Sequence, residues 1–210
     1  MRHILSNCQL ALKRYEWRHN EVLKIIFEEL TDLVNKSNNG DKPQKYMPGQ
    51  SMTFIWTGRG ITSTPTKETM DMERWRGKWE LASDLTGARR PFPIPTIQKP
   101  DIFLWNDEQR MLELVELTVP FEANIDEASQ RKIVRYEDLV KECAFDGWKT
   151  WHSPIEVGCR GFVGFRLKKW FLSTGFTEAH TKNILKRIQE TVEKASHWIW
   201  IKRDDESWFE

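Results

Sequence analysis

The chain has 210 residues, of which 39% are hydrophobic, 30% charged and 12% aromatic, and its formal net charge is +1. This length supports one good hydrophobic core and gives no reason to expect a second. A near-neutral charge excludes a uniformly basic or acidic protein, so a nucleic-acid-binding face would need its positive charge gathered locally.

The three cysteines, Cys8, Cys143 and Cys159, are an odd number and follow no CxxC spacing. They favour a reducing compartment over a disulfide framework. The N-terminal residues are too charged for a signal peptide, and no stretch approaches the roughly 20 apolar residues of a membrane helix. We therefore expect a nuclear or otherwise intracellular protein that is not secreted and has no membrane partner.

Hydrophobic periodicity predicts the elements in chain order. They are a helix over 18–35, strands over 52–57, 79–85, 101–105 and 111–121, a helix over 125–144 with a capping-box pattern at Asn124 and Glu127, a strand over 150–157, and helices over 162–172 and 177–200. This order predicts an α/β (α+β) fold with a mixed central sheet flanked by helices and a C-terminal helical extension. The predicted core consists of Ile102, Leu114, Val115, Leu117 and Val119 with Val22, Ile25, Ile26 and Leu30 of the first helix.

Two carboxylates fall in strands that otherwise read as buried. Asp101 begins one strand, and Glu116 lies in the next, where alternation puts it with Thr118 on the face opposite Val115 and Leu117. An unpaired carboxylate in a sheet core costs several kcal/mol, and two close together repel unless a cation neutralises them. Oxygen-only ligation with room for water suits Mg²⁺. The sequence therefore predicts a metal site here.

The helix after these strands offers a cation to the same site. The chain runs away from Glu116 along the strand and then returns along the helix that begins at Ile125. The rise per residue of a strand and of a helix places Lys132 level with Thr118. Tyr136, one turn later, shares the stripe of Lys132. Metal-assisted cleavage of a phosphodiester needs a cation near the attacking water or the scissile phosphate, which is the role expected of Lys132.

These residues resemble the signature of the PD-(D/E)XK nuclease superfamily. The stretch KPD ends at Asp101, and the triplet ELT begins at Glu116, with Thr118 where the signature has lysine. Some members supply the lysine from the following helix, where Lys132 lies. The resemblance implies a restriction-endonuclease-like core in which Asp101, Glu116 and Thr118 hold Mg²⁺ or Mn²⁺. It also implies that Asp101, Glu116, Lys132 and Tyr136 form the catalytic set.

The order of six short blocks is similar to the C-terminal restriction-like endonuclease region of non-LTR retrotransposon proteins. The blocks are HILSNCQLAL, RYEWRHNEVL, PDIFLW, VELTVPFE, RKIVRYEDL and PIEVGCRGF. In that family the region follows a reverse transcriptase and nicks DNA for target-primed insertion. The resemblance implies a Mg²⁺-dependent endonuclease that nicks double-stranded DNA, with RNA and a reverse transcriptase domain or chain as further partners. The alternative is a catalytically degenerate module that binds nucleic acid, or a subunit of a reverse transcriptase complex.

The family also has a zinc knuckle, CxxC followed by HxxxxC, before the nuclease. Only His3 and Cys8 match it here, and two ligands cannot make a tetrahedral zinc site, so zinc is not expected. The expected division is a remnant of the knuckle and its lead-in over 1–17, followed by a single restriction-like endonuclease domain over 18–210.

Other charged residues have both a functional and a structural interpretation. Asp84, on the strand over 79–85, is a candidate additional acid or a surface residue. Glu156 and Arg160 lie on either side of a tight turn, where they could pair with each other or leave Arg160 to contact phosphate. Glu113 is expected to be solvated or at an edge of the sheet. The candidates for nucleic-acid contact, each equally readable as solvated surface, are Arg131, Arg135, Arg160, Arg166, Lys168 and Lys169.

Overall fold

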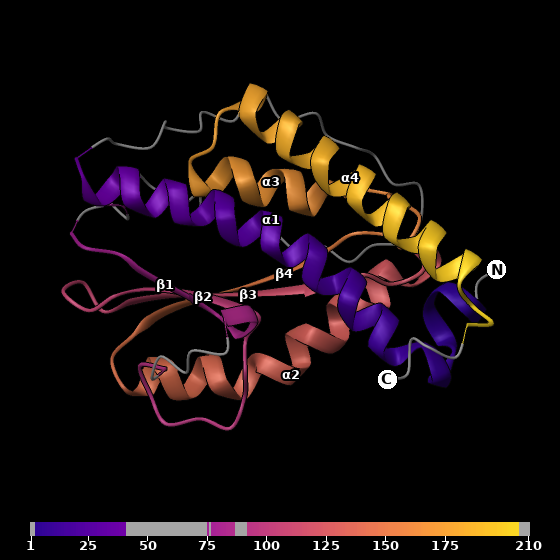
Figure 1. Cartoon of the computed structure of the whole chain (residues 1–210). Helices are drawn as coiled ribbons and strands as arrows, with labels where there is room; N and C mark the ends of the chain where they lie inside the picture. The colour runs from indigo at the N-terminus through magenta and orange to yellow at the C-terminus, as the bar shows by residue number, and fades with distance from the viewer. Residues whose placement is uncertain (1–2, 41–74, 76, 87–91, 206–210) are drawn as a thin grey trace, which may run out of the picture.

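A computed structural model describes residues 3–40, 75, 77–86 and 92–205. The strand expected over 52–57 lies outside the described residues. In the described part, a four-stranded sheet is covered by helices on both faces, with α2 on one face and α1, α3 and α4 on the other (Figure 1). The mixed sheet flanked by helices that the sequence predicts is confirmed.

The strands lie side by side in chain order. They are β1 (Glu80–Ser83), β2 (Ile102–Asn106), β3 (Met111–Thr118) and β4 (Lys149–Glu156). The first three are antiparallel neighbours, while β4 runs parallel to β3. A parallel neighbour needs a long crossover connection, and α2 supplies it.

The main helices are α1 (Leu12–Asn38), α2 (Ile125–Phe145), α3 (Phe165–Thr174) and α4 (Glu178–Ile201). Short helical turns lie at His3–Asn7, Gln9–Ala11, Asp84–Thr86 and Glu122–Asn124. None of the helices in the described part of the chain has both the length and the apolar character needed to cross a bilayer.

The larger core lies between α1 and one face of the sheet. Val22, Ile26 and Leu30 recur every four residues along α1 and are fully buried in the cluster that contains Val115 and Leu117 of β3. Two residues expected in this core are only half-buried. They are Ile25, which lies off the α1 stripe, and Val119, which follows the end of β3.

The opposite face of β3 packs on α2. Leu112 and Leu114 are buried against Tyr136 and Leu139 of that helix. Because β3 is covered on both faces, its six central residues are all buried. Glu116 belongs to this α2 face, as the period of two predicts.

Two expectations about local structure are wrong. Asp84 does not lie on a strand, because β1 ends at Ser83 and Asp84 begins an exposed 3-10 turn. The capping box before α2 is absent, since the Asn124 side chain makes no capping hydrogen bond. A capping residue needs an extended backbone, but Asn124 ends a 3-10 turn with φ −110° and ψ 8°. At α4, the Thr177 hydroxyl does accept from the backbone N–H of His180 at 3.1 Å.

Glu113 is also placed differently from the expectation. It is 3% exposed, so it is neither solvated nor at an edge. Its carboxylate accepts hydrogen bonds from Trp170 Nε1 at 2.8 Å and Ser153 Oγ at 2.9 Å. The reason is that α3 covers this face of the sheet and brings a donor to a position that would otherwise be exposed.

Truncation of Leu117 tests this arrangement. Leu117→Ala should lower the free energy of unfolding by about 2–5 kcal/mol, because it removes buried atoms between α1 and the sheet. Val134→Ala, on the exposed side of α2 where the side chain is 67% exposed, should change it by less than about 0.5 kcal/mol. Urea denaturation measures both values, and equal costs would contradict the assigned face of β3.

Candidate active site

Asp101 lies where β2 has not yet begun. The pairing of Ile102 with Val115 sets Asp101 beside the end of β3, where its Oδ2 accepts from the backbone N–H of Leu117 at 2.8 Å. The same oxygen lies 3.2 Å from His19 Nε2, which is also 3.1 Å from the Leu117 carbonyl oxygen. The Asp101 side chain therefore continues the hydrogen bonding of the sheet and is fixed to α1 through His19.

The Asp101 carboxylate changes the titration of His19. Burial alone lowers the pKa of His19, but the hydrogen bond and the charge of Asp101 outweigh it, and the net pKa is raised. His19 is therefore a hydrogen-bonded, partly buried histidine that fixes the orientation of Asp101.

Glu116 is 1% exposed and faces α2. Its Oε2 lies 2.5 Å from Lys132 Nζ, whereas its Oε1 is buried and accepts no hydrogen bond. Desolvation, and then the charge of Asp101, raise the pKa of Glu116 against the opposing pull of Lys132. The fold thus brings Asp101, Glu116 and Lys132 together, and it leaves one carboxylate oxygen without a partner.

Tyr136 lies on the same side of α2 as Lys132. Its hydroxyl donates to the Lys99 carbonyl oxygen at 2.9 Å, which fastens the segment that leads to Asp101 onto the helix. Desolvation, and then the nearby Glu116 carboxylate, raise the pKa of Tyr136, so its phenol stays protonated. The geometry places Tyr136 as a residue that positions Asp101.

His152 was not predicted from the sequence. It stands opposite Leu114 in the β3–β4 register, and its ring centroid lies 5.0 Å from that of Tyr136. Desolvation, with a further contribution from the charge of Lys132, lowers the pKa of His152 to about 4, so the ring is neutral at pH 7. Alternate residues of β4 face α2, as do their partners in β3, and this pattern could have identified His152 from the sequence.

Glu156 is, with Glu116, a second buried carboxylate on the α2 face of the sheet. It pairs in register with Thr118, is 2% exposed, and leaves its Oε1 without a hydrogen-bond partner. Desolvation raises the pKa of Glu156. Its nearest cation is Arg166, with Nη1 at 3.9 Å from Oε2, and Arg166 also lies 3.4 Å from Asp126.

The expected pair between Glu156 and Arg160 is not formed. Arg160 instead binds Glu122, which accepts from the Arg160 backbone N–H and from Nε, both at 2.8 Å. A Cβ atom at Gly158 would lie 2.8 Å from Glu122 Cγ, so this turn requires glycine. Arg160 therefore forms a structural ion pair, as one of its two interpretations proposed, but with Glu122 and not with Glu156.

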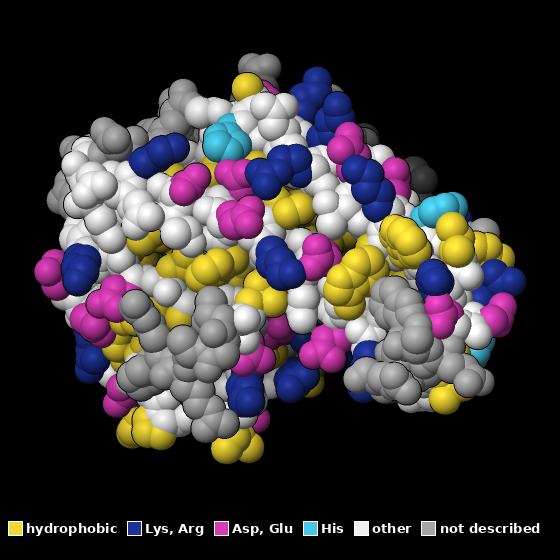
Figure 2. Space-filling model, in the orientation of Figure 1, with side chains coloured by type: hydrophobic (Ala, Val, Ile, Leu, Met, Phe, Trp, Pro, Cys, Tyr) yellow, Lys and Arg dark blue, Asp and Glu magenta, His cyan; other side chains and the backbone are white. Residues whose placement is uncertain are grey.

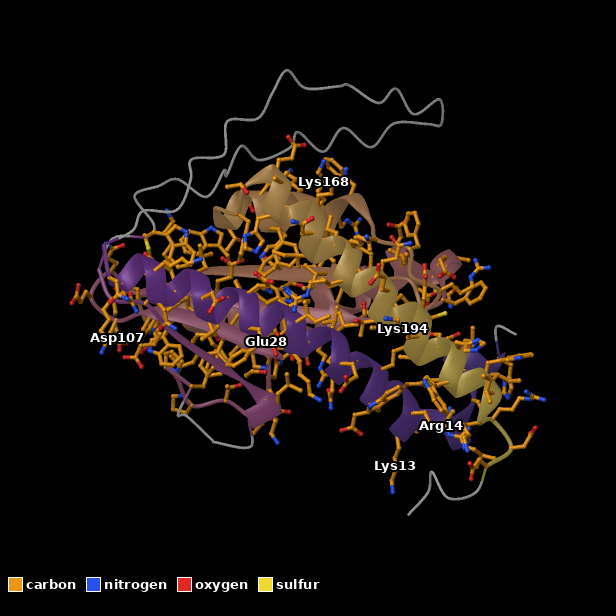
Figure 3. All side chains as sticks on the ribbon, turned by 45° about the horizontal axis from the view of Figure 1, so that its top comes forward. Lys13, Arg14, Glu28, Asp107, Lys168 and Lys194 are labelled. Carbon is orange, nitrogen blue, oxygen red and sulfur yellow. The ribbon has the colours of Figure 1, made fainter. Side chains whose placement is uncertain are left out.

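The other basic candidates do not converge on one place. Arg131 pairs with Glu127 at 2.8 Å on exposed α2, whereas Lys168 of α3 pairs with Glu178 at 3.2 Å in the layer across the sheet (Figure 3). Arg135 and Lys169 are exposed. On the face shown in Figure 2, basic and acidic side chains are interspersed and not gathered by sign.

The donor set can be compared with the needs of a metal ion. Among the described residues, no group of three or more His, Cys, Asp or Glu side chains is placed to hold a metal. Asp101 and Glu116 supply two carboxylates, and the Thr118 hydroxyl is buried without a partner. Mg²⁺ keeps several waters and is often held by one or two carboxylates. The unpartnered Glu116 oxygen therefore fits Mg²⁺ or Mn²⁺.

The pKa of His152 predicts a pH-dependent stability. Since this pKa is about 4 in the folded protein against an ordinary 6.5, the unfolded chain takes up the proton first as the pH falls. The free energy of unfolding should therefore decrease between pH 6.5 and 4, by up to about 3 kcal/mol. Urea denaturation at a series of pH values measures it.

Two variants test whether His152 causes this pH dependence. His152→Phe keeps a ring against Tyr136 without a titrating group and should flatten the dependence. His197→Gln, at an exposed position of α4, should leave it in place. An unflattened profile in His152→Phe would show that His152 is not held neutral.

The site is assembled from four separate elements. His19 comes from α1, Asp101 from the start of β2, Glu116 from β3, and Lys132 from α2. The site combines two carboxylates with one ammonium and one histidine, and of these side chains only that of Glu116 is fully buried. No model of a known protein family matches the chain, and no curated protein matches it.

Proposed function

We propose that the chain is a divalent-metal-dependent endonuclease that nicks double-stranded DNA, built on a PD-(D/E)XK core. The observation that carries the proposal is the state of Glu116, which binds Lys132 through one oxygen and leaves the other buried and unpartnered beside Asp101. With His19 neutral, the two carboxylates and the one ammonium would leave negative charge, which a divalent cation would neutralise.

The residues have distinct roles in this proposal. Asp101 and Glu116 would hold Mg²⁺ or Mn²⁺, which when bound lowers the pKa of a water and polarises the phosphate. The Lys132 side chain is 21% exposed, and Glu116 holds its ammonium in place. There it would stabilise negative charge that develops on the phosphate in the transition state. Tyr136 and His19 position Asp101 from two helices.

The topology supports the same assignment. The order α1, β1, β2, β3, α2, β4 corresponds to the core order of the superfamily that the KPD and ELT stretches resemble. A lysine supplied from the helix after the acidic strand suits the ion pair between Lys132 and Glu116. In the retrotransposon proteins that the blocks resemble, RNA and a reverse transcriptase domain or chain would be further partners.

A second candidate function is nucleic-acid binding without cleavage, alone or as a subunit of a reverse transcriptase complex. The specific observation that favours it is that each carboxylate already has protein partners. Asp101 Oδ2 accepts from Leu117 and contacts His19, while Glu116 Oε2 binds Lys132. A site satisfied in this way can persist as structure after catalysis is lost.

Nicking of a supercoiled plasmid tests the first candidate. The chain should convert it to the open-circular form with Mg²⁺ or Mn²⁺ and not with EDTA, and Asp101→Asn and Glu116→Gln should each abolish the activity. Lys132→Ala should lower the single-turnover rate about 10²–10³-fold while DNA affinity stays nearly intact, because it removes one transition-state contact. Lys141→Ala, at an exposed position on the same helix, is the matched control.

The outcomes separate the candidates. Metal-dependent nicking that survives Asp101→Asn would contradict the assigned site. A gel shift with salt-dependent affinity and no cleavage under either metal would support the binding module, since phosphate contacts release counterions.

A further inference from the structure

A pocket of about 220 Å³ lies at the junction of α1, the end of β3 and the start of α2. The polar residues that line it include Asn7, Arg18, Thr118, Asn124 and Arg131. Arg18 follows Arg14 by one helical turn, at the end of the molecule where Figure 3 labels Arg14. We call this cavity the Arg18 pocket.

The Arg18 guanidinium is buried without a carboxylate partner in the described part of the chain. The residue is 1% exposed, and it donates from Nη1 to Ser196 Oγ at 2.9 Å and from Nη2 to the Val119 carbonyl oxygen at 3.2 Å. Its Nε has no partner. A buried charge is normally paired, because removing it from water costs several kcal/mol. The guanidinium also lies over the Tyr15 ring, with Cζ 5.3 Å from its centroid, and the charge of Glu122 acts on it without forming an ion pair.

Two further features of the pocket suit an anion. The Thr118 hydroxyl is buried and unpartnered, so it has a hydrogen bond to give. The 21-residue helix α2 begins at the pocket, which Asn124 and Ala128 line, while the Ile125 N–H donates to the Glu122 carbonyl oxygen. The positive end of a helix dipole attracts anions.

The acids near this helix start have other partners. Asp126 lies 3.4 Å from Arg166, and Glu127 lies 2.8 Å from Arg131. Glu122 binds Arg160. These pairs offset part of the negative charge around the entrance, although the charge of Glu122 still acts on Arg18.

We propose that the Arg18 pocket binds a phosphate group, held by the Arg18 side chain and the Thr118 hydroxyl beside the positive end of the α2 dipole. Thr118 lies two residues beyond Glu116 on the same face of β3, about 7 Å along the strand. If the proposed function is correct, the occupant is a backbone phosphate of the nucleic acid next to the scissile one. Thr118 also belongs to the donor set considered for the metal, but Arg18 does not, so phosphate binding by Arg18 can be tested apart from that function.

Phosphate binding is measured in EDTA, so that neither metal nor cleavage is involved. Inorganic phosphate is titrated into the full chain with intrinsic tryptophan fluorescence or calorimetry as the readout, and a short DNA duplex is then added as competitor. Arg18→Met should weaken phosphate binding at least about tenfold, and Thr118→Val about threefold. Lys141→Met, far from the pocket on exposed α2, should bind as wild type does.

Asn124→Asp gives the sharpest test. Aspartate at this position adds a negative charge next to the positive end of the α2 dipole, so the melting temperature should be kept or raised. The added charge faces the pocket, so phosphate affinity should nevertheless fall at least about threefold. A melting temperature that is kept or raised together with a lower phosphate affinity would support the proposal even if Arg18→Met fails to fold.

Competition by the duplex identifies a nucleic-acid backbone as the ligand, whereas phosphate binding without competition identifies a free phosphate. Either result supports the pocket. No saturable phosphate binding by wild type, or unchanged affinity in both Asn124→Asp and Thr118→Val, would overturn it. Phosphate binding that persists in a chain unable to nick DNA would count against the proposed endonuclease and not against the pocket.

Discussion

The burial of the Glu116 charge beneath α2 is the constraint around which the other contacts are arranged. An apolar residue of similar size would pack there at lower cost, since a buried ion pair rarely repays its desolvation. The fold instead holds the charge with Lys132, fastens the neighbouring Asp101 through His19 and Tyr136, and still leaves one oxygen unsatisfied. An arrangement that is costly for stability and specific in geometry is typical of a site kept for its chemistry.

The two proposals together describe a surface whose charge changes sign along one strand. Asp101 and Glu116 make the first part negative, and Arg18, with the start of α2, makes the part beyond Thr118 positive. A polyanion alone would be repelled from the first part and attracted to the second. Binding of the backbone at the positive part would present the next phosphate to Lys132, so that positioning would precede neutralisation of the acids.

Features that depend on neighbouring residues in the sequence could be predicted, whereas those that depend on residues far along the chain could not. The face of Glu116 and the stripe of Lys132 depend only on the local periods of a strand and a helix, which the sequence shows directly. The burial of Glu113 depends on Trp170, 57 residues away, and the partner of Arg160 lies 38 residues away. Such contacts are decided by which helix covers which face. The capping box failed for a local reason, because the preceding 3-10 turn determines the backbone angles.

The contacts of Glu122 with the turn after β4 connect two segments that are distant in the sequence. Glu122 precedes α2 and is bonded to the backbone of Arg160, while Gly158 packs so closely that no side chain fits between them. The entry to α2 and the exit from β4 are therefore tied together by direct contacts. Since α2 also carries Lys132, this tie links the end of β4 to the helix that presents the ammonium to Glu116.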